Sequence, residues 1–93
     1  MAKSMHRKRK MLLRKHGGIF SHIIVDGISL PKWIIPCSYC NKELVGYSQM
    51  TVDHIIPRSK GGGNKADNLC IACHSCNYAK ADKLLVDFLG KVE

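Results

Sequence analysis

The chain has 93 residues and carries fifteen Lys and Arg against seven Asp and Glu, for a formal net charge of +8. This length indicates one domain with a marginal hydrophobic core, so a further stabilising element such as a metal is expected. No run approaches the roughly 18 apolar residues of a membrane-spanning helix. No apolar signal segment follows the charged N-terminus, so we expect a cytoplasmic protein with reduced cysteines.

Residues 1–16 form a basic arm, since all charged residues before Asp26 are positive. Such an excess of positive charge favours a polyanionic partner, and nucleic acid is the commonest. One interpretation of the arm is a short helix that contacts phosphate without sequence choice; the other is a solvated, frayed tail. Its densest basic run is Arg7, Lys8, Arg9 and Lys10.

Residues 17–36 begin with a Gly-Gly break and predict a hairpin extension. Ile19 to Leu30 is apolar and rich in β-branched residues, with a turn signal at Asp26-Gly27. Pro31 and Pro36 bracket an extended approach to the first cysteine pair. The segment either adds a hairpin alone or also widens a nucleic-acid contact surface.

Two CxxC pairs predict a structural zinc site: Cys37 with Cys40, and Cys73 with Cys76. Each turn places two sulfurs on one side of a tetrahedron, and two turns close the site. Four thiolates and one Zn²⁺ would leave the chain at about +6, still basic. Cys70 and Cys73 also form a CxxC, but the helix predicted to start near Cys73 favours Cys73 and Cys76, leaving Cys70 as a buried thiol. His74 is more simply a surface residue of that helix than a phosphate contact.

Short elements are predicted between and after the cysteine pairs. They are a strand over residues 49–56, a glycine loop over 59–64, a second segment over 66–71, a helix over 73–80 and a last helix beginning near Asp82.

This stretch resembles the HNH endonuclease family, whose pattern is CxxC, then DHIxPxSxGG, then NL, then CxxCN or CxxCH with a trailing Lys. In this chain those motifs begin at Cys37, Asp53, Asn68 and Cys73, and the trailing residue is Lys80. The resemblance implies an α+β fold: a small ββα-metal (His-Me finger) domain with a structural zinc site made of four cysteines. Its nuclease core would span residues 37–82, followed by a C-terminal helix or tail over 83–93.

The residue types suit phosphodiester hydrolysis. His54 is suited to deprotonating water near neutral pH, and Asp53 and Asn77 offer hard oxygens that suit Mg²⁺ or Mn²⁺. The resemblance implies that His54 is the general base, that Asp53 and Asn77 hold one catalytic ion, and that Asn68 holds the loop and orients the His54 ring. Arg58 and Lys80 flank this site and are expected to contact phosphate.

The pattern therefore predicts a metal-dependent endonuclease that nicks double-stranded DNA with low specificity, as a monomer or weak dimer. The alternative is a catalytically inactive, zinc-stapled DNA-binding module, which would bind without cutting. A structural protein that grips another protein through its zinc knuckle is a third hypothesis, which the basic arm disfavours. The family's occurrence implies a phage or mobile-element setting, in a bacterial or phage-infected cell, or a place in a larger assembly.

Overall fold

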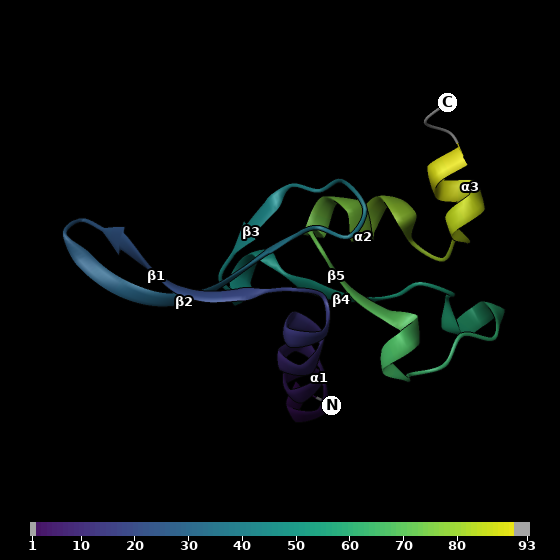
Figure 1. Cartoon of the computed structure of the whole chain (residues 1–93). Helices are drawn as coiled ribbons and strands as arrows, with labels where there is room; N and C mark the ends of the chain where they lie inside the picture. Colours follow the sequence, from purple (N-terminus) through teal and green to yellow (C-terminus); the bar gives the residue numbers. More distant parts are fainter. Residues whose placement is uncertain (1, 91–93) are drawn as a thin grey trace.

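The computed structural model describes residues 2–90, with side chains described from Lys8 onward. It is an α+β structure with two antiparallel sheets, ordered β1-β2-β3 and β4-β5 (Figure 1). Its helices and strands are α1 (Ala2–Lys15), β1 (Ile19–Val25), β2 (Ile28–Pro36), β3 (Glu43–Val45), β4 (Thr51–His54), β5 (Leu69–Ala72), α2 (His74–Lys80) and α3 (Leu85–Leu89). Three 3-10 turns, η1 (Tyr47–Gln49), η2 (Arg58–Lys60) and η3 (Ala66–Asn68), lie in the connections. None of the described helices is long and apolar enough to cross a membrane.

The second sheet and the helix after it form a ββα unit, which confirms the expected fold class. β4 pairs with β5 so that Asp53 lies opposite Cys70 and His54 opposite Leu69. The chain enters α2 directly after β5, and Cys73 caps this helix by accepting the Cys76 N–H on its Sγ at 3.4 Å. A long connection from β4 to β5 carries η2 and η3.

The predicted hairpin is confirmed, with its turn at Asp26-Gly27. Both turn residues have positive φ, 51° and 79°, as expected where two residues join antiparallel strands with the native twist. The second strand is longer than predicted, because it continues through Pro31 to Pro36. Pro31 is tolerated there because β3 pairs only with residues 34–36, so the missing N–H faces an open edge. The hairpin projects from the body of the molecule (Figure 1).

The basic arm is a helix docked on the ββα unit, which favours the helical interpretation over the frayed tail. Leu12 and Leu13 are fully buried and join Ile35, Leu69 and Ile71 in one hydrophobic core. Burying a leucine contributes about 1.5–3 kcal/mol, so two of them anchor the helix. α1 contacts both β4 and β5, so the helix lies beside the strand that carries Asp53 and His54.

Candidate metal centre and active site

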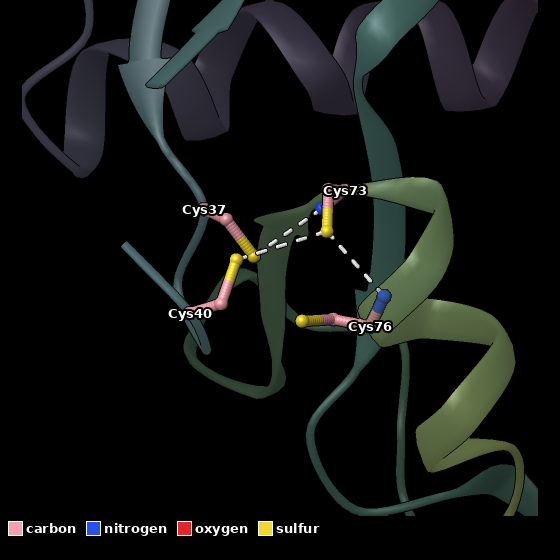
Figure 2. Close-up of side chains that lie close together, drawn as sticks. All are labelled: Cys37, Cys40, Cys73 and Cys76. Atoms are coloured by element: carbon pink, nitrogen blue, oxygen red, sulfur yellow. Dashed lines mark hydrogen bonds between the residues drawn. The ribbon is translucent and has the colours of Figure 1, made fainter. Parts of the chain in front are cut away.

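The four cysteines of the two CxxC pairs meet at one point. Their Sγ atoms all lie within 4.8 Å of one another, and Figure 2 shows the side chains converging from the turn after β2 and the start of α2. The Cys40 and Cys73 sulfurs are 3.9 Å apart, close to the roughly 3.8 Å that separates sulfurs in a tetrahedron with Zn–S bonds of about 2.3 Å. The donor set therefore fits a four-coordinate structural zinc ion.

The surrounding backbone favours the thiolate form of Cys37. Burial opposes ionisation of Cys37, but backbone N–H groups of Cys40, Cys73 and Tyr39 outweigh it and lower the pKa of the Cys37 thiol to about 6. Burial and hydrogen bonding to the neighbouring cysteines raise the pKa of Cys76. One thiolate forms readily and then opposes the next, so full ionisation of the cluster needs a cation at its centre.

Cys70 lies outside the cluster, as predicted. It is buried and donates its S–H to the Tyr39 hydroxyl at 3.3 Å, while burial raises its pKa. His74 is an exposed residue of the first turn of α2, and its Nε2 is 2.9 Å from the Ser48 carbonyl oxygen. The ambiguity between the overlapping CxxC motifs is thus resolved in favour of Cys73 and Cys76.

Asp53 is buried on β4 and held by two donors on the same oxygen. The Tyr39 hydroxyl donates to Asp53 Oδ2 at 2.5 Å, and the Lys80 ammonium group lies 3.2 Å from it. Burial and the bond to Asp53 raise the Tyr39 pKa, so this phenol stays a donor. Asp53 Oδ1 is the carboxylate oxygen that these two contacts leave to other ligands.

Lys80, which we expected to contact phosphate, is buried in the structure and paired within the protein. Its side chain is 0% exposed, and its Nζ donates to the His54 carbonyl oxygen at 2.9 Å besides pairing with Asp53. α2 ends at Lys80 and contacts β4, so the last residue of the helix points its amine back into the strand. Lys80 therefore fixes the end of β4 instead of meeting solvent.

His54 extends toward the loop between β4 and β5, away from the partners of Asp53. Its Nε2 is 2.7 Å from the side-chain oxygen of Asn64. Asp53 is thus held by α2 and Tyr39, while His54, the last residue of β4, contacts the loop that follows the strand. Asn64 and Tyr39 are the two site residues that the sequence interpretation missed. The only signals for them are a polar residue after the glycine run and an aromatic residue inside the first CxxC.

Asn68 holds this loop closed through three hydrogen bonds. Its Nδ2 donates to the carbonyl oxygens of Ile56 at 3.1 Å and Gly63 at 2.9 Å, and its Oδ1 accepts the Ile56 N–H at 2.9 Å. Gly62 sits inside this clamp, where a Cβ would lie 1.7 Å from the Ile56 carbonyl oxygen. These contacts of the Asn68 side chain are to the loop backbone, and the contact to the His54 ring comes from Asn64.

Two further predicted residues flank the site. Asn77 lies on α2 with a half-buried side chain, one residue after Cys76. It shares a helix face with Lys80, because residues three apart in a helix are neighbours, and Lys80 reaches Asp53. Arg58 is exposed in η2, at the start of the loop.

Of the basic residues of α1 that the sequence analysis singled out, Lys8 contacts the same loop. Lys8 Nζ donates to the Asn64 carbonyl oxygen at 3.2 Å, Arg9 lies with its guanidinium 5.0 Å from the centre of the Tyr47 ring, and Lys10 is exposed. The Arg7 side chain lies outside the described residues.

The sequence comparisons agree with this geometry. The profile of the HNH endonuclease family matches residues 37–83, about half of the chain, and the chain belongs to this family. Members of the family are generally nucleases that act on nucleic acid. Searches of curated proteins and of solved structures returned no match.

Proposed function

We propose that this protein is a metal-dependent DNA endonuclease in which His54 is the general base. The observation that carries the proposal is the 2.7 Å contact between His54 Nε2 and Asn64 Oδ1. A side-chain carbonyl oxygen can only accept, so Nε2 carries the proton and Nδ1 keeps its lone pair. The contact thus selects the tautomer that a base requires and stabilises the imidazolium that forms when a water molecule is deprotonated.

Asp53 and Asn77 are the proposed ligands of one Mg²⁺ or Mn²⁺ ion. The described residues hold no second cluster of three His, Cys, Asp or Glu ligands, so this ion would depend on Asp53 Oδ1, the Asn77 amide oxygen, water and substrate. These hard oxygens fit such an ion. When bound, it supplies charge neutralisation at the phosphate and help for the leaving oxygen. Lys80 and Tyr39 orient the Asp53 carboxylate by occupying Oδ2.

Double-stranded DNA is the proposed substrate, cut on one strand in each encounter. One ββα unit presents one His54, and the helix with Lys8 and Lys10 lies beside it to contact phosphates without reading bases. The proposed products are nicks of low sequence specificity, made by a monomer or weak dimer. We further propose a phage or mobile-element setting, in which a reducing bacterial cytoplasm would keep the four thiols available for zinc.

The test is nicking of a supercoiled plasmid with Mg²⁺ or Mn²⁺ added or withheld. We expect metal-dependent conversion to the open circle by the wild type and its loss in His54→Ala. The matched control is His22→Ala, which removes an exposed histidine from the hairpin and should nick like the wild type. Equal nicking by His54→Ala and wild type would exclude His54 as the base.

One observation favours the alternative, a catalytically inactive DNA-binding module. Asp53 is only 7% exposed, and the Lys80 charge already compensates its carboxylate. If this ion pair excludes a metal, the wild type will bind duplex DNA but leave the plasmid supercoiled with every divalent ion tried.

A further inference from the structure

Three aromatic side chains from different elements meet beside α1, and His54 is not among the residues that line this surface. They are Phe20 of β1, Trp33 of β2 and Tyr47 of η1, and we call their surface the aromatic cleft. The Phe20 and Trp33 rings are 5.3 Å apart between centroids, at 56°. The Gly46 N–H donates to the Trp33 carbonyl oxygen at 2.8 Å and so ties the η1 turn to β2. Three separate segments therefore build one surface.

The aromatic rings border two adjoining hollows. One, of about 420 Å³, is completed by Lys10 and Arg14 of α1. The other, of about 250 Å³, is completed on the hairpin side by Pro31, Lys32, Gly46 and Ser48. The larger falls within the range of roughly 300–1,000 Å³ usual for small-ligand sites. Phe20 is 56% exposed, so its ring is open to a ligand instead of packed in the core.

The charge around the aromatic cleft is positive. Among the described residues, those with charge that line the two hollows are Lys10, Arg14 and Lys32. The Arg9 guanidinium lies over the Tyr47 ring, and Arg9 Nε is buried with no hydrogen-bond partner in the described part of the chain. Exposed aromatic faces next to cations are how proteins hold unpaired nucleotides, because the base stacks and the backbone is neutralised. A duplex hides its base faces and cannot use the rings.

We propose that the aromatic cleft binds an unpaired nucleotide of a single-stranded nucleic acid, with the base on Phe20 and Trp33 and the phosphates on Lys10 and Arg14. This binding site extends the proposed nuclease function, and its biological role rests on that function. α1 connects the two places: Lys8 donates to the loop that holds His54, and Arg14 lines the cleft about 9 Å further along the helix axis. An unpaired stretch that adjoins the duplex substrate thus lies in the cleft, while the duplex beside it reaches the active-site loop.

Trp33 is the single tryptophan of the chain, so its fluorescence reports directly on the cleft. The experiment titrates oligo-dT, and a duplex of equal length, into His54→Ala without added divalent ion, so that no cutting occurs. We expect saturable quenching by oligo-dT and weaker quenching by the duplex. Phe20→Ala should weaken oligo-dT binding about 5- to 150-fold, the usual cost of removing one stacking partner.

Matched controls separate the cleft from general charge attraction. Tyr78→Ala removes an aromatic ring that is 89% exposed on α2 and should leave binding unchanged. Lys10→Gln should weaken binding more than Lys15→Gln, which removes the same charge from an exposed position of α1 that does not line the cleft. Zinc content and circular dichroism check folding, and Lys10→Gln, at an exposed position, keeps the test decisive if Phe20→Ala is unstable.

The outcomes distinguish this proposal from the nuclease itself. If oligo-dT does not quench the fluorescence of His54→Ala while the wild type nicks plasmid, the proposed nucleotide binding in the cleft is refuted and the proposed nuclease function stands. Equal weakening by Lys10→Gln and Lys15→Gln, with no effect of Phe20→Ala, also overturns it. Stacking lost in Phe20→Ala but retained in Tyr78→Ala supports the cleft, even if the wild type fails to nick.

Discussion

Replacing Asn64 with alanine tests whether the loop prepares His54 for catalysis. The substitution removes the oxygen that lies 2.7 Å from His54 Nε2. That bond strengthens as the imidazole gains charge, and hydrogen bonds to charged groups contribute about 1.5–3 kcal/mol. The corresponding loss of nicking rate is about 10- to 150-fold. Because Asn64 is exposed, water can partly replace its oxygen, so the lower end is expected.

The assay is single-turnover nicking of plasmid at saturating protein, with duplex binding measured separately. We expect the rate constant to fall while DNA affinity stays unchanged, since the His54 ring acts on the reacting water. Ser59→Ala is the control, because it removes an exposed polar side chain from the same connection. A wild-type rate constant in Asn64→Ala would refute the argument that this amide selects the tautomer of His54.

Asn64→Asp gives the same prediction a pH dependence. The introduced carboxylate still accepts from Nε2, so activity at high pH should be retained. A nearby negative charge favours the protonated ring, and only the unprotonated ring can act as a base. The acidic limb of the pH–rate profile should therefore move to higher pH in Asn64→Asp. A shift toward lower pH, or none, would show that the introduced carboxylate does not face the ring.

Three further outcomes follow from the structure. Native mass spectrometry should find one zinc ion per chain. Cys40→Ser should lose this ion and also the cooperative thermal unfolding transition, because a small domain depends on a bound metal for stability. A zinc-free protein of unchanged thermal stability would contradict this. Lys80→Met should lower the free energy of unfolding by about 3–5 kcal/mol, because it leaves buried Asp53 without its counter-charge. In urea unfolding, the double variant that adds Asp53→Asn should recover part of this lost stability. Gly62→Ala should lower the nicking rate by forcing the loop away from Ile56, and a variant as active as wild type would show that this loop tolerates displacement.

The parts of the fold that depend on local signals could be predicted from the sequence. The CxxC turns, the Asp26-Gly27 turn and the helix after Cys73 each have their cause within a few residues. The docking of α1 could not be predicted, because it depends on contacts between residues far apart in the sequence. Leu12 and Leu13 are buried, and β5, which α1 contacts, begins more than fifty residues after them.

The same division holds in the candidate site. The motif indicated which segments meet, but the partner of each side chain depends on how those segments fold. The motif singled out Asn68 as the residue that orients the His54 ring, yet Asn64 contacts that ring and Asn68 binds the loop backbone. A trailing lysine is most simply a surface charge, yet Lys80 is buried because α2 ends directly over Asp53.

The four-cysteine cluster and the proposed active site are connected through α2. Cys73 and Cys76 set where the helix begins, and seven residues after Cys73 the same helix delivers Lys80 to Asp53 and to the His54 carbonyl. From the opposite pair, Tyr39 sits between Cys37 and Cys40 and reaches the same carboxylate. Both CxxC turns therefore contribute a residue that positions Asp53, and closing the cluster brings those residues together. A zinc ion bound by the four sulfurs would therefore help to assemble the proposed site, and we expect loss of zinc to abolish nicking even though none of the four sulfurs is proposed to contact the substrate.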